Sequence, residues 1–370
     1  MKVECTKNQL LRVVSLTEKV TGKKLALPVL SKIIFEVKGK NFFTRATNLD
    51  MAVEIKVNTK TSQDGIIAVP GLVLEAHLSN LPETNVFIET TNESLILKTS
   101  NSSARISIEK VDDFPVFSKE KLKEGMYINI TGTDLVGAIK SVSYASSVSE
   151  IKPELASILF SIRDKELIFV ATDSFRLAEK RVKIGSNGIN IDDFAVLVPQ
   201  RSAVEIARIF DGYDGNIEIA TTKDEIEFRT DTTFVTARLV NGNFPPYETI
   251  IPKSASTQVV LSRDELLSAI RLATVFADKF SQVSFHVIPE DHLFEVGGKA
   301  DNKGEATARV DATTEGLAVD VRLNAKYFID CLSSLKGGDI SIGFNGPDKA
   351  MVVRHSGDRS FLYLLMPLNR

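Results

Sequence analysis

Tryptophan is absent from the sequence, and only two cysteines and four histidines occur among its 370 residues. Cys5 and Cys331 lie far apart, and neither belongs to a Cys-x-x-Cys or His-paired arrangement, so we expect no metal site. Cys331 shares a helical face with Phe328 and Leu332, which favours a place in the core. With no tryptophan and six tyrosines, stacking of bases on aromatic rings is a weak candidate for the function.

Long apolar runs and an excess of positive charge are also missing. No run of about 18 apolar residues occurs, so neither a transmembrane helix nor a membrane partner is expected. Residues 1–20 mix charges through their apolar positions, unlike a signal peptide, and this predicts a cytoplasmic protein. The formal net charge of −3 does not by itself indicate a nucleic-acid partner, which would need positive charge gathered on one surface.

Recognisable catalytic arrangements are absent as well. None of the histidines sits beside a Ser or Cys in a nucleophile motif. They are His77, His286, His292 and His355. Gly22-Lys23-Lys24 lacks the upstream Gly and the following Ser or Thr of a phosphate-binding loop. We therefore predict that the protein is not an enzyme and needs no cofactor. A hydrolase or transferase built around Asp173 and Arg176 is the enzymatic alternative.

What the sequence does contain is a threefold internal repeat. Three segments align at a spacing of roughly 125 residues, the size of a domain rather than of a solenoid repeat. They are Ala46–Ala52, Ala171–Ala178 and Lys299–Ala306. A second phrase closes each repeat, as Asp113-Phe114-Pro115, Asn243-Phe244-Pro245 and Leu365-Met366-Pro367. The repeat predicts three domains, at 1–127, 128–255 and 256–370.

Each repeat is expected to run helix, strands, helix, strands. Apolar stripes at helical spacing indicate the helices. They are expected at Asn8–Val20, Leu72–Leu78, Thr133–Ser146, Arg201–Phe210, Asp264–Phe276 and Ala325–Leu335. Alternation in 217–220 and 225–228 predicts half-buried strands, and Ser262 with Glu265 predicts a capping box. The fold class is therefore α+β, with two helices packed on antiparallel sheet in each of three repeated domains.

The segment Ala171–Ala178 is the strongest candidate for a turn that carries function. Asp173 and Ser174 are turn formers, because their short polar side chains bond their own backbone. Phe175 follows them in the loop, where a polar residue is more usual than an aromatic one. Taken alone, the segment favours a hairpin with Phe175 folded back onto the core.

Basic residues recur on the polar faces of the predicted helices. They are Arg12, Lys24, Lys140, Arg201, Arg208, Arg271 and Lys326. On any single helix such residues are typical of an ordinary solvated face. Their recurrence in all three repeats favours a shared basic surface that contacts phosphates and reads no sequence.

Several phrases together resemble the bacterial β sliding clamps, the processivity rings of DNA polymerase III. They are Leu27-Pro28-Val29-Leu30, Ala171–Ala178, Phe244-Pro245-Pro246-Tyr247 and Met366-Pro367-Leu368, and the resemblance covers the whole chain. It implies a head-to-tail homodimer in which six domains form a ring, with helices inside and sheets outside. Double-stranded DNA would be held by topology, independently of its sequence.

The resemblance also implies a groove that docks the replicative polymerase, the clamp loader and repair proteins through short linear motifs. Mapped onto matching positions, its residues are Leu155, Thr172, Ser174, Phe175, Arg176, Leu177, Pro245, Thr249, Ile250, Leu364, Met366, Pro367 and Leu368. An apolar chain end should not stay in water unless it packs or binds something. Phe175 stands where many members carry His, and Thr249 where a basic residue is common. The resemblance therefore implies the groove but does not give its peptide preference.

For the ring contacts, Ile106 and Ile108 resemble the edge strand of the first domain, and Val275 and Phe276 the opposing surface of the third. Core packing is the alternative for all four, because apolar residues are usually inside. Replacing Ile106 and Ile108 by Lys is expected to give folded monomers.

We predict a DNA sliding clamp that confers processivity on the replicative polymerase. The alternative is a three-domain protein-interaction scaffold that does not bind DNA.

Overall fold

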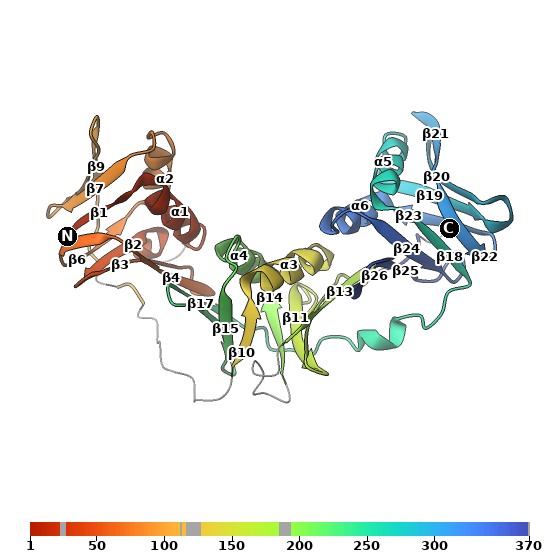
Figure 1. Ribbon diagram of the computed structural model, residues 1–370, viewed down its shortest axis with the longest axis horizontal. Helices are drawn as coiled ribbons and strands as arrows, with labels where there is room; N and C mark the ends of the chain where they lie inside the picture. The colour runs from red at the N-terminus through yellow and green to blue at the C-terminus, as the bar shows by residue number, and fades with distance from the viewer. Residues whose placement is uncertain (23–26, 112, 116–126, 185–193, 369–370) are drawn as a thin grey trace. The chain divides into compact units, whose positions relative to one another are not determined.

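The computed structural model describes residues 1–22, 27–111, 113–115, 127–184 and 194–368. The chain divides into two compact units, whose elements are labelled in Figure 1. Unit 1 comprises Met1–Val136, Gly185–Ile191 and Val204–Leu239, and unit 2 comprises Gly137–Ile184, Asp192–Ala203 and Val240–Arg370. This division runs through the second repeat, so the boundaries of the three expected domains stay a prediction.

Unit 1 is built on two antiparallel sheets. Its strands are β1 (Lys2–Thr6), β2 (Ile33–Lys38), β3 (Asn41–Thr47), β4 (Met51–Val57), β5 (Lys60–Gln63), β6 (Gly65–Val69), β7 (Asn85–Thr90), β8 (Ser94–Lys98), β9 (Ser103–Ser107), β10 (Ile128–Thr131), β15 (Asn216–Thr221), β16 (Glu225–Arg229) and β17 (Thr233–Arg238). One sheet has the order β5-β1-β7-β8-β9 and the other β10-β15-β16-β17-β4-β3-β2-β6. Helices α1 (Lys7–Glu18) and α2 (Gly71–Ser79) pack together, and α1 also contacts β3 and β4.

Unit 2 repeats this plan. Its strands are β11 (Ser157–Arg163), β12 (Glu166–Thr172), β13 (Arg176–Lys183), β14 (Ala195–Pro199), β18 (Thr257–Ser262), β19 (Gln282–Ile288), β20 (Leu293–Ala300), β21 (Gly304–Arg309), β22 (Ala312–Gly316), β23 (Val319–Asn324), β24 (Asp339–Phe344), β25 (Met351–His355) and β26 (Asp358–Leu365). They form sheets of order β14-β11-β12-β13-β26-β25-β24-β18-β22 and β21-β20-β19-β23. Helices α5 (Arg263–Thr274) and α6 (Ala325–Ser334) pack together.

The remaining helices are short or cross the boundary between the units. Helices α3 (Gly132–Val142) and α4 (Gln200–Ile209) each begin in one unit and end in the other. The single-turn helices are η1 (Pro28–Ser31), η2 (Ser143–Ala145), η3 (Tyr247–Ile250) and η4 (Pro289–Asp291). All six expected α-helices are therefore confirmed, and the residues expected to end the third helix form η2 instead.

The predicted capping box at Ser262 is wrong. Ser262 is the N-cap of α5, but its side chain makes no capping hydrogen bond. It is also the last residue of β18 and pairs with Asp339, so the sheet sets its backbone. A capping box opens α1 instead, where Thr6 Oγ1 accepts from the Gln9 amide at 3.3 Å and Gln9 Oε1 accepts from the Thr6 amide at 3.4 Å.

The large sheet of each unit runs without a break from one repeat into the next. In unit 1, β4 of the first repeat pairs with β17 of the second. In unit 2, β13 of the second repeat pairs with β26 of the third. These pairings bring the turn that precedes β13 beside the residues that follow β26, although the two segments are far apart in the sequence.

The core confirms the expectation for Cys331, which is fully buried, and Cys5 is buried as well. Across the ranges that the structure describes, no group of three or more His, Cys, Asp or Glu side chains is arranged to hold a metal ion. In those same ranges no helix is long and apolar enough to cross a membrane.

Candidate functional site

The turn between β12 and β13 presents Phe175 to solvent. Thr172 Oγ1 donates to the carbonyl of Arg176 at 2.7 Å. Asp173 Oδ1 accepts from the amides of Phe175 and Arg176, at 2.9 and 3.0 Å. Ser174 adopts a φ of 79°, and the side chain of Phe175 is 61% exposed. The expectation that Phe175 folds back onto the core is therefore wrong, because the hydrogen bonds of the turn direct it outward.

Arg176 closes this turn and joins it to α6. Its Nε donates to Asp173 Oδ2 at 2.9 Å, and its Nη1 donates to Asp330 Oδ2 at 2.7 Å. The guanidinium carbon lies 4.2 Å from the ring centroid of Tyr327 and 5.8 Å from that of Tyr144. Burial opposes the charge, but the hydrogen bonds to the two carboxylates outweigh it and raise the pKa of Arg176. Arg176 is therefore a buried structural residue that links the turn to α6.

The C-terminal segment lies against the same turn. The amide of Met366 donates to the carbonyl of Phe175 at 2.8 Å, and the amide of Leu368 donates to the carbonyl of Arg322 at 2.8 Å. Pro367 between them is buried, whereas Met366 is 42% exposed. The apolar chain end is thus packed at Pro367 and open to solvent at Met366.

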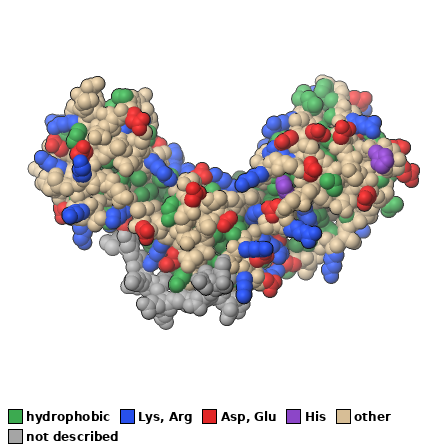
Figure 2. Space-filling view, viewed as in Figure 1, with side chains coloured by type: hydrophobic (Ala, Val, Ile, Leu, Met, Phe, Trp, Pro, Cys, Tyr) green, Lys and Arg blue, Asp and Glu red, His purple; other side chains and the backbone are tan. Residues whose placement is uncertain are grey.

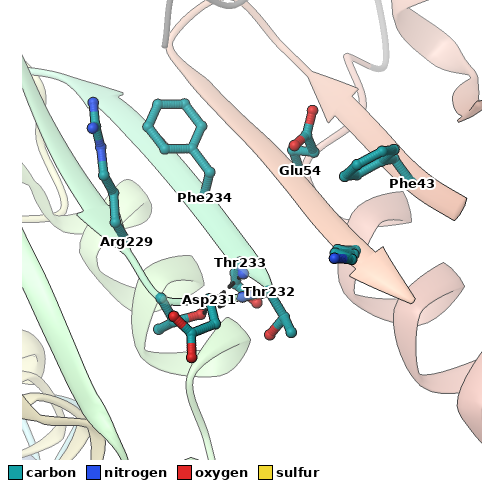
Figure 3. Close-up of a pocket in the computed structure, with 9 residues that line it drawn as sticks. Phe43, Glu54, Arg229, Asp231, Thr232, Thr233 and Phe234 are labelled. Carbon is teal, nitrogen blue, oxygen red and sulfur yellow. Dashed lines mark hydrogen bonds between the residues drawn. The ribbon is translucent and has the colours of Figure 1, made fainter. Parts of the chain in front are cut away.

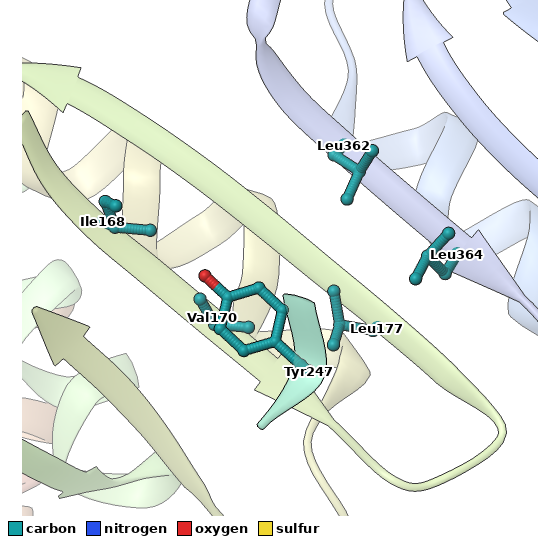
Figure 4. Packing of buried hydrophobic residues seen from close by; sticks show 6 residues of the cluster. All are labelled: Ile168, Val170, Leu177, Tyr247, Leu362 and Leu364. Carbon is teal, nitrogen blue, oxygen red and sulfur yellow. The ribbon is translucent and has the colours of Figure 1, made fainter. Parts of the chain in front are cut away.

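An apolar cluster supports the turn and the chain end from below (Figure 4). It comprises Ile168, Val170, Leu177, Tyr247, Leu362 and Leu364. The ring of Tyr247 comes from η3, and its hydroxyl donates to Glu179 Oε2 at 2.7 Å. Burial, together with this bond to Glu179, raises the pKa of Tyr247. Ile250, at the end of η3, is 59% exposed.

Three exposed apolar side chains therefore meet the solvent from three separate segments of unit 2. Phe175 comes from the turn, Ile250 from η3 and Met366 from the chain end. The other predicted groove residues lie on the same segments, except for Leu155, which is buried beside η2 with its carbonyl bonded to the Ser147 amide at 2.8 Å. Such a surface suits the apolar anchors of a peptide.

Four residues of the site escaped the sequence prediction. They are Tyr144, Tyr247, Tyr327 and Asp330. Tyr247 belongs to the phrase that carried the resemblance, so its neighbours Pro245 and Thr249 were a signal for it. Tyr327 and Asp330 flank Phe328 on α6, and nothing in their spacing indicates a partner in the second repeat.

The predicted DNA-facing residues differ in how far they are open to solvent. Arg12, Lys140, Arg201, Arg271 and Lys326 are exposed, and Lys24 lies outside the described residues. Arg201 Nη2 lies 3.1 Å from Glu150 Oε1. On the face drawn in Figure 2, Lys and Arg side chains are interspersed with Asp and Glu.

Arg208 is held within unit 1 by hydrogen bonds. Its Nη1 and Nη2 donate to the carbonyls of Ser15 and Leu16 at 3.2 and 2.9 Å, and its Nε donates to Glu205 at 2.6 Å. These acceptors lie at the end of α1 and on α4, so Arg208 joins the two helices. Three of the five N–H donors of Arg208 are therefore engaged within the unit.

The predicted interface residues also separate into buried and exposed. Ile106 is buried and Ile108 is half-buried, whereas Val275 is 65% exposed. Phe276 is half-buried. Strand β9 does form the edge of its sheet, but the side chain of Ile106 faces the core of its own unit. The double Lys replacement would therefore place a charge in that core, and its expected outcome of folded monomers is withdrawn.

A separate cavity of about 200 Å³ opens in unit 1 beside the β16–β17 turn (Figure 3). The rings of Phe43 and Phe234 stand on its two sides, with Glu54 between them. The guanidinium carbon of Arg229 lies 5.3 Å from the centroid of Phe234, and Arg45 Nε donates to Glu54 at 2.5 Å. Two of the charged side chains that line this cavity are thus paired within the chain, Glu54 with Arg45 and Arg229 with Glu227.

Comparison with protein families covers almost the whole chain. Residues 1–118, 129–246 and 248–369 match, in that order, the N-terminal, central and C-terminal domains of the DNA polymerase III beta subunit. A curated relative, the beta sliding clamp of Bacillus subtilis, is 25% identical over 383 residues, covering 100% of this chain and 99% of the relative. That of Staphylococcus aureus is 23% identical and covers 95% of each.

Solved structures show the same fold. The beta subunit of DNA polymerase III from Thermotoga maritima superposes with a TM-score of 0.91 at 25% identity, covering 100% of this chain and 99% of that one. A sliding clamp from Pseudomonas aeruginosa bound to griselimycin gives a TM-score of 0.91 at 23% identity, with full coverage of both chains.

Proposed function

The chain belongs to the DNA polymerase III beta subunit family, the β sliding clamps, and we propose that its groove docks the partners of such a clamp. The protein is a DNA sliding clamp and not an enzyme. It confers processivity on the replicative polymerase as a dimeric ring on double-stranded DNA, which needs no sequence-specific contact. The family does not favour a scaffold without DNA binding. Chromosome replication in bacteria takes place in the cytoplasm, and we propose that location.

Exposed cations would supply the phosphate contacts. Arg12, Lys140, Arg201, Arg271 and Lys326 are open to solvent, and a moderate number of such contacts allows sliding. Lys24 remains part of this proposal. Arg208 also remains part of it, although its guanidinium is partly engaged with α1 and Glu205.

The clamp function is tested by topology. Once loaded, the protein should stay on closed circular DNA and leave linear DNA through its free ends. Equal loss from both forms, or sequence-specific retention on linear DNA, would refute a topological hold.

The groove rests on one observation, which is the exposure of Phe175, Ile250 and Met366 on three adjoining segments. Water is displaced from such side chains only when a partner covers them. The Pseudomonas aeruginosa clamp is bound to griselimycin, and this supports the proposal that a protein of this fold accepts a ligand.

Removal of the chain end tests the groove. Deleting 366–370 should abolish binding of a fluorescent peptide that carries a Gln and two downstream hydrophobic residues, measured by anisotropy. Dimer mass and retention on circular DNA should be unchanged. Equal affinity for the truncated and full chains would place the groove elsewhere.

Two unpaired sheet edges support the dimeric ring. Strand β9 is an edge strand of one sheet of unit 1, and β21 is an edge strand of one sheet of unit 2. An exposed edge is a template for pairing with another chain. Leu272, Val275 and Phe280 are exposed on and after α5, and we propose that they, with Phe276, form the apolar part of the contact. Ile106 then supports β9 from within its own unit, and Ile108 lies just beyond the strand.

A further inference from the structure

The Arg176 end of the groove carries an excess of negative charge. One guanidinium, that of Arg176, is bonded by two carboxylates, those of Asp173 and Asp330, so the group bears one net negative charge. The side chains of Arg176 and Asp173 are 9% and 13% exposed, whereas that of Asp330 is 41% exposed. The part of the group that meets the solvent is therefore a carboxylate.

The neighbouring groove residues do not offset this charge. Phe175, Ile250 and Met366 are apolar, and the hydroxyl of Thr249 donates to the carbonyl of Pro246 at 2.8 Å. Two of the guanidinium nitrogens of Arg176 are already bonded to carboxylates and its face is stacked on the ring of Tyr327, so the solvent meets this group mainly through Asp330.

Two further cations lie on the elements around the site. Lys326 is exposed in the first turn of α6, and Arg322 is exposed on β23, where its carbonyl holds the amide of Leu368. Arg322 reaches the C-terminal segment through its backbone carbonyl. Lys326 lies one helical turn before Asp330, but no ion pair joins these two side chains in the described structure, so the Asp330 carboxylate is bonded from Arg176.

We propose that Asp330 makes the Arg176 end of the groove select against acidic residues in its ligands. The partners would be peptides with apolar anchors and neutral or basic residues beside the anchor nearest Arg176. This rests on the peptide-docking function proposed above. A ligand carboxylate a few ångströms from Asp330 should weaken binding about threefold to tenfold at low ionic strength, where screening is slight.

A scan of charge through the ligand tests this selection. In a short fluorescein-labelled peptide with a Gln and two hydrophobic anchors, each other position is occupied in turn by Asp, Asn or Lys. Anisotropy titrations against the full-length dimer give a ratio of dissociation constants, Asp over Asn, for each position. At one position or more the ratio should reach about three and fall towards one at high ionic strength.

Asp330→Asn is the diagnostic variant. Its amide oxygen can still accept from Arg176, so the turn is kept while the net charge becomes zero. The Asp-over-Asn ratio should fall to about one at the sensitive position. Glu315→Gln, which removes an exposed carboxylate on the edge strand β22, is the matched control and should leave the ratio unchanged.

The outcomes separate the two proposals. Tight binding of every Asp peptide, or a ratio that Asp330→Asn leaves unchanged, would overturn the selection while the docking groove stands. If no peptide binds the unmodified dimer, the docking function fails and the selection fails with it. Because each ratio compares ligands on one variant, a general loss of stability cancels out.

Discussion

Two turns of this protein share one hydrogen-bonding scheme and differ in what they present. Turn 1 is Thr47–Met51, between β3 and β4, and turn 2 is Thr172–Arg176, between β12 and β13. The first hydroxyl donates to the fifth carbonyl at 2.8 Å in turn 1 and 2.7 Å in turn 2. The second side chain accepts from the fourth and fifth amides in both. The third residue has a φ of 76° in turn 1 and 79° in turn 2.

The two turns differ in their last two residues. The fourth is Asp50 in turn 1 and Phe175 in turn 2, and its carbonyl accepts from the neighbouring segment at 2.8 Å in both turns. The fifth is Met51, which is buried, in turn 1 and Arg176 in turn 2. The first three residues thus set the backbone, and the last two are where the two turns differ.

The sheet face beside each turn differs in the same way. In unit 2, Glu179 lies between Val170 and Leu362 of the neighbouring strands. Its carboxylate accepts from Arg181 Nε at 2.7 Å and from the Tyr247 hydroxyl at 2.7 Å. The register places Glu54 of unit 1 at the position of Glu179, with Arg45 and Phe234 on either side of it. That face holds the cavity of Figure 3. Both faces therefore pair their glutamate with an arginine, and they differ in what covers it, which is the ring of Tyr247 in unit 2 and the cavity in unit 1.

The largest effect is expected when turn 2 receives the fifth residue of turn 1. Arg176→Met removes the cation between Asp173 and Asp330 and should cost about 2–3 kcal/mol, below the range for a fully buried pair because Asp330 is partly exposed. Urea unfolding followed by near-ultraviolet circular dichroism measures this. Met51→Leu, a matched change in turn 1, should stay within about 1 kcal/mol. Equal costs for the two variants would show that the ion pairs of turn 2 do not stabilise it.

Exchanging the fourth residue should change binding more than stability. Phe175→Asp should weaken peptide affinity about thirtyfold, equivalent to about 2 kcal/mol, because an exposed aromatic anchor is lost. The unfolding free energy should change by less than about 0.5 kcal/mol, since the side chain is exposed. The reciprocal variant Asp50→Phe should leave peptide binding as it is. A gain of peptide binding by Asp50→Phe would mean that the turn alone makes a groove.

The repeat and its turns could be predicted because they depend on local sequence. Asp173 and Ser174 specify their turn through short side chains, and the apolar stripes specify the helices. The partners of Arg176 could not be predicted, because Asp330 is 154 residues away and reaches it only through the pairing of β13 with β26. The acceptors of Arg208 on α1 are backbone carbonyls, which leave no trace in the sequence.

The burial of Ile106 shows a second limit. Alternation along a strand separates two faces, but it does not say which face meets the core. The sequence correctly indicated an edge strand, and β9 is one. It did not establish that the side chain of Ile106 packs into the core of its own unit.

A smaller effect is expected at the support of the groove. Tyr247→Phe removes the donor to Glu179 Oε2, leaving a buried oxygen unsatisfied, and should cost about 1–2 kcal/mol in urea unfolding. Tyr213→Phe is the control, because the Tyr213 hydroxyl bonds the Asn216 carbonyl only at 3.4 Å and is exposed. If Tyr247→Phe costs no more than the control, the bond to Glu179 does not fix η3.

The smallest effect concerns acid and the far end of the β13–β26 pair. Burial opposes ionisation of Asp358, but hydrogen bonds from Lys180 and Ser360 outweigh it and lower its pKa from 3.8 to about 2. A carboxyl whose pKa is lowered by folding stabilises the protein above the unfolded pKa, and this contribution is lost as the pH falls from about 4 to about 2. Because Asp358 is 44% exposed, the loss should be about 1 kcal/mol. Unit 1 has Ile55 where unit 2 has Lys180, so Lys180→Ile should flatten this dependence. The pKa of the Asp358 carboxyl can be measured by NMR titration of the unmodified protein. An ordinary aspartate pKa there would show that the bridge to Lys180 is not formed in solution.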